Sequence, residues 1–413
     1  MTSTDTRSRN TTHERRITTA LFAAGLTTFA SMYSAQALLP SLSAAFGVAP
    51  AQAALAVSLT TGFLALAIIP VSALSSRIGR TRTMTGSAVI SAAIGLLLPL
   101  SPSLELLLAG RALQGVALAG VPAVAMAYLA EEIGGDGLGT AMGVYVAGTS
   151  IGGLAGRLIP AYALDLTSWR WAQAAIAVAA AGCTAWFVRG LPPSRGFLAR
   201  PAGMRTALGD LGTPLRHPGL LALFGLAFVL MGGFVSIYNF LGYRLIRRPF
   251  ELPAAVAGSV FLLYLAGTLA SAAAGHWADR IGKHRVLAAS VALMGVGVLV
   301  TIPDQLIAVI LGITLCTAGF FGAHAVASTW VGAMATGNRG AASSLYLFAY
   351  YLGSAIIGSG AGIAYAKGGW IGLAACVGAL VALAAVLVWY LTIHAHRGYE
   401  TRATSEVCAA PTA

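Results

Sequence analysis

Charged residues are scarce in this chain. They make up only 9% of its 413 residues, against roughly a quarter in soluble proteins. Hydrophobic residues make up 57%, so the chain has too little polar sequence to cover a soluble globule. Because a spanning helix needs about 20 apolar residues, the sequence suffices for about a dozen membrane crossings joined by short loops. The composition predicts an all-α, polytopic membrane protein.

Cysteines and acidic residues are also few. Cys183, Cys316, Cys376 and Cys408 show neither a CxxC pattern nor the paired spacing of metal ligands. We therefore expect no disulfide, no metal site and no cofactor. None of the 13 acidic residues falls at the centre of an expected span.

Twelve apolar segments bounded by proline, glycine or charge are the expected spans. They cover residues 17–39, 52–74, 84–100, 104–129, 138–160, 170–188, 218–241, 254–276, 286–302, 305–330, 341–366 and 370–393. The first could instead be a secretory signal, because arginines precede it and Ala35-Gln36-Ala37 resembles a cleavage site. We favour a span, since the segment is long enough to cross and its pattern returns later in the chain.

Short patterns occur twice along the chain. Three pairs match: residues 29–33 with 234–238, 77–80 with 280–283, and Gly148 with Gly353. Their displacements of 205, 203 and 205 positions nearly agree, which implies two homologous halves. The sequence thus predicts twelve transmembrane helices in two pseudo-symmetric six-helix bundles.

The expected organisation follows from this repeat and from a proline-rich stretch between the halves. It consists of a cytoplasmic N-terminal tail (1–16), an N-terminal bundle (17–188), a cytoplasmic linker (189–216), a C-terminal bundle (217–394) and a cytoplasmic C-terminal tail (395–413). With both termini in the cytoplasm, 18 of the 25 lysines and arginines lie on the cytoplasmic side. Topology therefore accounts for the net charge of +12, and we expect no nucleic-acid partner.

The loop after the eighth segment carries a charged signature. It reads Gly275-His276-Trp277-Ala278-Asp279-Arg280-Ile281-Gly282-Lys283. With the twelve-span pattern, this signature resembles the major facilitator superfamily over nearly the whole chain. The resemblance implies a transporter rather than an enzyme, in which one bundle rocks against the other around a small solute.

The same resemblance points to gating residues. A carboxylate at such a helix end can clamp arginines and a helix N-terminus, forming a releasable latch. We expect Asp279, Arg280 and Lys283 to gate, together with Gly79 and Arg80 at the matching place in the first half. There Ser76 stands where the family has an aspartate, so Asp279 is the better candidate.

The fourth segment contains an arginine within apolar sequence. Its stretch from Arg111 to Gly115 resembles the family's Arg-x-x-x-Gly signature. A guanidinium inside hydrocarbon must face a polar cavity or polar partners. We expect Arg111 to work in transport; the alternative is that it caps backbone carbonyls of a neighbouring span. Glu105, near the outer end of the same helix, could titrate or be a solvated acid at the helix start.

The fifth segment is rich in glycine. Gly148, Gly152 and Gly153 belong to a run that resembles the antiporter signature of the superfamily's efflux branches, with Thr149 in place of its proline. The GxxxG spacing permits close helix packing between parts that slide, so we count these glycines with the gate. The run also fits the GxSxG pattern around Ser150, which raises a membrane-embedded serine hydrolase as a remote alternative.

The resemblance also directs attention to polar and aromatic residues on the helices that line the cavity in this fold. A helix that is apolar apart from one stripe must turn that stripe inward. The expected cavity-lining or substrate-binding residues are Tyr33, Gln36, Arg111, Gln114, Tyr238, Asn239, Phe320, His324, Tyr346 and Tyr350. His324 is either a proton site that titrates near neutrality or a packed core histidine.

The lack of a mid-span carboxylate narrows the choice of a proton carrier. The candidates are Glu105, Asp165, His324 and Arg111.

Longer stretches, among them 148–159, 318–328 and 343–354, look like the YnfM-type transporters within the arabinose-efflux-like permeases. We expect a monomeric protein of the bacterial cytoplasmic membrane, surrounded by lipid, that exports a small amphipathic compound or metabolite in exchange for protons. The alternative is uptake or uniport of a sugar or metabolite.

Overall fold

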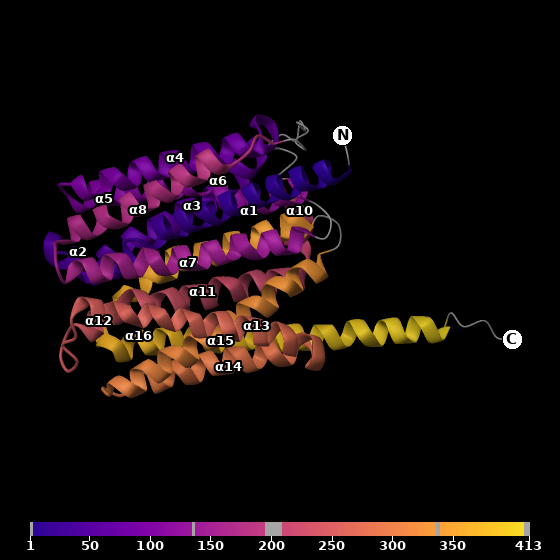
Figure 1. Ribbon diagram of the computed structural model, residues 1–413. Helices are drawn as coiled ribbons and strands as arrows, with labels where there is room; N and C mark the ends of the chain where they lie inside the picture. The colour runs from indigo at the N-terminus through magenta and orange to yellow at the C-terminus, as the bar shows by residue number, and fades with distance from the viewer. Residues whose placement is uncertain (1–2, 134–136, 195–208, 336–338, 409–413) are drawn as a thin grey trace. The chain divides into compact units, whose positions relative to one another are not determined.

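The computed structural model describes residues 3–133, 137–194, 209–335 and 339–408, and every regular element in these ranges is a helix (Figure 1). The first part of the chain forms α1 (Ser3–Tyr33), η1 (Gln36–Leu38), α2 (Leu39–Phe46), α3 (Pro50–Ile78), α4 (Arg80–Leu97), η2 (Leu98–Leu100), α5 (Leu104–Leu118), α6 (Gly120–Glu132), α7 (Leu138–Leu164) and α8 (Trp169–Gly190). The later part forms α10 (Gly212–Arg216), α11 (Pro218–Leu245), α12 (Ala254–Ser259), η4 (Val260–Leu263), α13 (Tyr264–Ile281), α14 (Lys283–Val300), α15 (Leu306–Met334) and α16 (Arg339–Cys408).

Ten helical stretches in the described ranges are long and apolar enough to span a membrane. The longest, Arg339–Ile393, covers the last two predicted segments, and α1, which is not among the ten, covers residues 17–33 of the first, 17–39. Each of the twelve predicted segments therefore corresponds to helical sequence, and the all-α, polytopic fold is confirmed. In hydrocarbon a backbone must satisfy its own hydrogen bonds, and a helix does so within one segment.

Glycines set the main interruptions of these helices. Gly369 has a φ of +55° and, with Gly368, breaks α16 between the predicted segments 341–366 and 370–393. Gly79 (φ +101°, ψ +146°) separates α3 from α4, and Gly282 (φ +96°, ψ +143°) separates α13 from α14. Such positive φ angles suit a residue without a Cβ. The near-identical turns show that the matched stretches 77–80 and 280–283 adopt one conformation.

The chain divides into two compact units, which do not coincide with the two sequence halves. The first unit contains residues 1–209, 235–262 and 354–373, and the second contains residues 210–234, 263–353 and 374–413. The predicted boundaries of bundles, linker and tails stay a prediction, and residues 195–208 of the linker lie outside the described residues.

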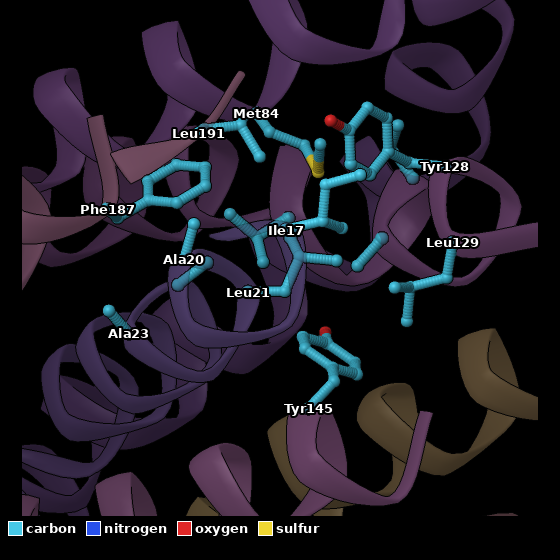
Figure 2. Packing of buried hydrophobic residues seen from close by; sticks show 14 of the residues in the cluster. Ile17, Ala20, Leu21, Ala23, Met84, Tyr128, Leu129, Tyr145, Phe187 and Leu191 are labelled. Carbon is cyan, nitrogen blue, oxygen red and sulfur yellow. The ribbon is translucent and has the colours of Figure 1, made fainter. Parts of the chain in front are cut away.

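The first unit has a buried apolar cluster around the middle of α1. Ile17 and Leu21 of α1 pack there with Tyr128 of α6, Tyr145 of α7 and Phe187 of α8 (Figure 2). These side chains are almost fully buried. Since lipid tails are as apolar as these residues, tight packing rather than water exclusion holds such helices together.

The glycines of the fifth segment bring α7 against α1. A Cβ at Gly148 or Gly152 would overlap the backbone carbonyl oxygens of Phe22 or Leu26, so only glycine fits at either position. The second unit repeats this contact, where a Cβ at Gly353 would overlap a carbonyl of α11. The predicted close packing at Gly148 and Gly152 is therefore present, and the repeat partner of Gly148 packs in the same way.

Candidate functional site

The buried guanidinium of Arg111 holds the end of α1. Its Nε donates to the carbonyl oxygen of Ala56 at 2.8 Å, and its two terminal nitrogens donate to those of Ser31 at 2.9 Å and Met32 at 2.6 Å. Nη1 also donates to the side-chain oxygen of Gln114 at 2.6 Å. The last carbonyls of a helix have no partner within the helix, and a cation there is favourable. This geometry is the carbonyl-capping arrangement, and it positions the chain that follows Tyr33.

A second buried arginine lies just beyond that end. Arg157 of α7 is 3% exposed, and its Nε donates to the side-chain oxygen of Gln36 at 2.6 Å. Its Nη1 donates to the carbonyl oxygen of Gly153, also at 2.6 Å. The guanidinium carbon lies 3.8 Å from the ring centre of Tyr33 and 5.4 Å from that of Phe261, within cation–π range. Arg157 thus contacts two of the predicted residues, Tyr33 and Gln36.

Sequence reasoning missed Arg157. The predicted fifth segment ended at residue 160, which placed Arg157 near the outer face together with the loop cations. In the structure α7 continues to Leu164 and buries the side chain. The signal that could have found it is a lone arginine four residues after Gly153 in an otherwise apolar helix.

Gln36 extends this contact into the second half of the sequence. Its Nε2 donates to the side-chain oxygen of Asn239 at 2.8 Å, and Asn239 Nδ2 donates to the carbonyl oxygen of Gly358 at 3.0 Å. Tyr238 stacks on Phe261, with ring centres 5.5 Å apart. We call the chain of hydrogen bonds from Arg157 through Gln36 and Asn239 to Gly358 the polar seam. It joins α7 and η1 of the first half to α11 and α16 of the second, within one compact unit.

Further polar contacts in the first unit link the same two halves. The Tyr243 hydroxyl lies 2.8 Å from the carbonyl oxygen of Leu39 and 2.7 Å from the Ser43 hydroxyl. Asp165, a predicted proton carrier, follows the end of α7 and accepts a hydrogen bond from the backbone N–H of Ala255 at 3.2 Å. These contacts lie at the same ends of the helices as the polar seam.

A small pocket of about 50 Å³ adjoins the polar seam. Its walls are mostly apolar. It is lined by Gln36, Ala37, Pro40, Ser41, Leu164, Tyr238, Leu241, Gly242, Ile246, Ala254, Ala257, Gly258, Val260 and Phe261.

The second unit brings four predicted residues together in an aromatic cluster. The Tyr346 hydroxyl lies 3.0 Å from His324 Nδ1, and the Tyr350 ring centre lies 4.7 Å from that of His324. Phe320 flanks the imidazole at 6.1 Å and stacks on Phe234 at 3.9 Å. The faces of α15 and α16 that carry these residues are turned toward each other. His324 therefore has a hydrogen-bonding partner, which the spacing of residues along the sequence does not reveal.

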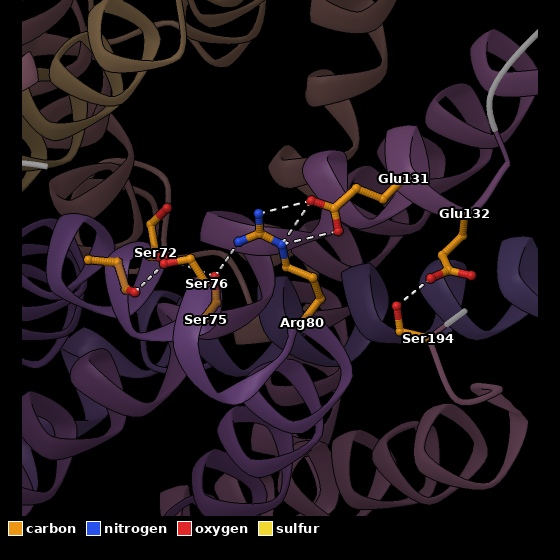
Figure 3. Close-up of polar contacts among 8 residues, drawn as sticks. Ser72, Ser75, Ser76, Arg80, Glu131, Glu132 and Ser194 are labelled. Atoms are coloured by element: carbon orange, nitrogen blue, oxygen red, sulfur yellow. Dashed lines mark hydrogen bonds and ion pairs between the residues drawn. The ribbon is translucent and has the colours of Figure 1, made fainter. Parts of the chain in front are cut away.

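The turn between α3 and α4 places the predicted gate residue Arg80 against a carboxylate. Its guanidinium donates to Glu131 of α6 at 2.9 Å and to the Ser75 hydroxyl at 2.6 Å (Figure 3). Ser76, which replaces the expected aspartate, donates to the carbonyl oxygen of Ala73 instead. Glu131 therefore supplies the carboxylate that the loop lacks, a partnership that the sequence analysis did not anticipate. Figure 3 also shows the neighbouring contact between Glu132 and Ser194.

The remaining predicted residues lie apart from these clusters. Asp279 and Arg280 are exposed at the end of α13, and among the described residues no ion pair joins either of them. Lys283 begins α14, and Glu105 lies exposed in the first turn of α5. Their gating and proton-coupling parts stay predictions.

Ser150 does not lie in a hydrolase elbow. It sits within α7, exposed, and its hydroxyl donates to the carbonyl oxygen of Val146 at 3.1 Å. A nucleophile elbow needs a strand before the serine, and the described ranges contain helices only.

Comparisons with known proteins agree with this architecture. The sequence model of the Major Facilitator Superfamily matches residues 21–261 and 223–407. The inner membrane transport protein YnfM of Escherichia coli is 41% identical over 391 residues, which cover 94% of this chain and 92% of that protein. The MFS-type transporter YybF of Bacillus subtilis is 38% identical over 379 residues, covering 91% and 92%.

Solved structures show the same fold. The nucleoside transporter NupG aligns with a TM-score of 0.76 at 13% identity, over 91% of this chain and 99% of that one. A D-xylose-proton symporter aligns with a TM-score of 0.72 at 14% identity, over 91% and 97%.

Proposed function

This chain belongs to the Major Facilitator Superfamily, and on that premise we propose that it exports a small amphipathic compound or metabolite in exchange for protons. The family and its named relatives are transporters, so the chain is a multi-pass membrane transporter and the hydrolase alternative is set aside. The inner-membrane relative supports a place in the bacterial cytoplasmic membrane. Both termini then lie in the cytoplasm, and the protein works as a monomer surrounded by lipid.

The observation that carries this proposal is the polar seam. It joins side chains of the two homologous halves by neutral hydrogen bonds and one charge-assisted bond. Each such bond contributes about 1 kcal/mol. The polar seam can therefore stabilise one conformational state and still break when the protein changes to the other. With the N-terminus in the cytoplasm, the seam lies toward the outer side, and alternating access requires it to break when that side opens.

The two buried arginines have different parts in this mechanism. Arg111 donates to the carbonyls that end α1, which positions Tyr33 and Gln36. Arg157 bonds the side chain that crosses between the halves. We assign the working charge of the outer gate to Arg157 and a positioning role to Arg111.

The cytoplasmic gate uses charges in the loops. Arg80 and Glu131 tie the α3–α4 turn to the end of α6. In the second half Asp279, Arg280 and Lys283 serve as the releasable counterpart. The glycines at 148, 152 and 153 let α7 slide along α1 as the gates alternate.

Protons are coupled through residues at the helix ends or in the aromatic cluster. Asp165 accepts a hydrogen bond through a carboxylate oxygen from the backbone N–H of Ala255 in the second half of the sequence. His324 and Tyr346 offer a second exchangeable proton in the second unit. Uniport of a metabolite is the second candidate function, and the lack of acidic residues at the centre of the predicted spans favours it.

Proteoliposomes with an imposed pH gradient test the exchange directly. A cargo compound added to one side should dissipate the gradient in protein-containing vesicles and not in empty ones. Compound uptake without any proton movement would favour uniport, and no response to a broad panel of amphipathic compounds would contradict the export proposal.

A further inference from the structure

Four basic residues gather in the first unit, beyond the polar seam. We call them the basic cluster, and they are Arg244, Arg247, Arg248 and Lys367. The three arginines lie at and just after the end of α11, and the lysine lies just before the kink of α16. The Arg244 guanidinium carbon lies 4.7 Å from the ring centre of Trp370, and Arg247 lies close enough to Tyr365 to act electrostatically on its hydroxyl. These contacts bring the end of α11 to the part of α16 that carries Lys367.

The predicted topology does not account for the basic cluster. It leaves seven of the 25 lysines and arginines off the cytoplasmic side, and the four of the cluster are among them. The other three, Arg111, Arg157 and Arg170, donate to oxygen atoms of the chain itself. Because basic residues are normally concentrated on the cytoplasmic side, four at the opposite end of the helices indicate that their charge has a function.

Acidic residues do not balance this charge. Glu251, the only acid between α11 and α12, pairs with Arg248 at 3.0 Å, and Asp165 bonds a backbone N–H of α12 instead. Arg247 and Lys367 are exposed, and within the described ranges neither side chain forms a hydrogen bond or an ion pair. Both can therefore donate to a phosphate from outside the chain, the arginine as a planar fork and the lysine as a point charge.

An exposed apolar face of α16 leads up to Lys367. Ile356, Gly360 and Ile363 lie on this face at helical spacing from the lysine, and the two isoleucines are 56% and 60% exposed. A Cβ at Gly360 would meet no atom within 4 Å, so the face is open there. A face that is apolar along its length and basic at its end matches an acyl chain with an anionic headgroup.

We propose that the basic cluster binds the phosphodiester headgroup of an anionic phospholipid, with one acyl chain along the exposed face of α16. Arg247 and Lys367 donate to the phosphate oxygens, and Ile363 packs against the chain. The cluster lies at the ends of two membrane-spanning helices, where the bilayer itself presents headgroups, and this favours a lipid over a soluble anion. The partner comes from the membrane, so the inference is independent of the cargo.

Native mass spectrometry of the purified full-length protein in detergent measures this binding. Phosphatidylglycerol and phosphatidylcholine with the same acyl chains serve as probes, because only phosphatidylglycerol carries a net negative charge. Phosphatidylglycerol should bind roughly tenfold or more tightly, since each basic residue near an anionic headgroup adds to the attraction. Equal affinities for the two lipids would overturn the inference.

Variants separate the basic cluster from a general effect of charge. The Arg247→Gln/Lys367→Gln double variant should lose the preference for phosphatidylglycerol, and both changed side chains are exposed, so the packing of the helices stays intact. Arg189→Gln/Arg285→Gln is the matched control, because it removes the same charge from exposed arginines in the last turn of α8 and the first turn of α14. The control should keep the full preference. A preference that survives in the cluster variant, or that falls equally in the control, would contradict the site.

Two further arms separate a lipid from a soluble anion. Inorganic phosphate at millimolar concentration should not displace phosphatidylglycerol, because it has no acyl chain to lie along α16. Ile363→Ser should weaken the binding of both lipids severalfold and leave the preference between them unchanged. Displacement by inorganic phosphate would assign the basic cluster to a soluble anion, and unchanged lipid affinity of Ile363→Ser would remove the acyl chain from α16.

Discussion

Arg157 and Gln36 lie 121 residues apart in the sequence and form a 2.6 Å hydrogen bond between the guanidinium and the side-chain amide oxygen. The same amide continues to Asn239 in the second half of the sequence. Gln36 therefore connects a buried charge of the first half to a side chain of the second, and mutations along this connection can test the proposed outer gate.

Loosening the polar seam should favour the outward-open state. Asn239→Ala removes the bonds to Gln36 and Gly358, a loss of about 2 kcal/mol, or roughly a 30-fold gain in the open population. A cysteine at Ala257, a buried residue of the pocket lining, should then react faster with an impermeant maleimide added outside, in a background without native cysteines.

Gln173→Ala is the control for this experiment. Gln173 is a buried amide that donates to Ser34 within the first half. Its removal should leave the labelling rate at Ala257 unchanged. An equal increase of the labelling rate in both variants would mean that labelling reports a general loosening of the protein and not the opening of the polar seam.

Arg111→Ala should abolish transport while the protein stays inserted in the membrane. The change removes the guanidinium from the carbonyls of Ser31, Met32 and Ala56. Ser31 keeps the Ser34 hydroxyl as a donor and Ala56 keeps that of Thr60, so the main cost falls on the buried Met32 carbonyl, at about 1–3 kcal/mol. Arg111→Lys should retain part of the activity, because an ammonium can reach some of these oxygens but lacks the planar fork. Transport assays and membrane-fraction blots measure the two effects, and full activity of Arg111→Ala would disprove the positioning role.

Gly152→Ala should destabilise the contact between α1 and α7. The added methyl group meets the backbone of Leu26, and such overpacking costs about 1–3 kcal/mol. Gly143→Ala on the same helix meets no atom within 4 Å and serves as the control. Thermal unfolding should show a lower midpoint for Gly152→Ala alone, and equal midpoints would contradict the packing account.

At the proposed cytoplasmic gate, Glu131→Gln should change the balance of states more than Asp279→Asn does. Arg80 pairs with Glu131 at 2.9 Å with both side chains partly buried, whereas Asp279 is exposed. A pair of this exposure contributes about 0–1 kcal/mol, so the expected change in cytoplasmic cysteine labelling is at most roughly fivefold. A larger effect from Asp279→Asn would restore Asp279 as the main gate residue.

Hydropathy and repeated motifs predicted the helical segments because those signals depend only on local sequence. The turn at Gly79 and its counterpart at Gly282 could be matched because each needs a glycine at a fixed place in a motif. Local signals of this kind are enough to predict the fold and the position of each residue along its helix.

Partnerships between helices could not be predicted in the same way. Whether Arg80 meets Glu131, or His324 meets Tyr346, depends on how each helix is rotated and how close its neighbour lies. Arg157 was missed for a related reason: a span boundary drawn a few residues too early put it near the outer face, with the loop cations, and not in the buried interior.

The central claim is that the two homologous halves separate and rejoin during each transport cycle. Gly62 of α3 and Ala355 of α16 lie close enough for a disulfide, because a Cβ at Gly62 would lie 3.0 Å from that of Ala355. In a background without native cysteines, oxidation of the Gly62→Cys/Ala355→Cys double variant in proteoliposomes should stop transport, and a reductant should restore it. Undiminished transport by the fully cross-linked protein would contradict the account.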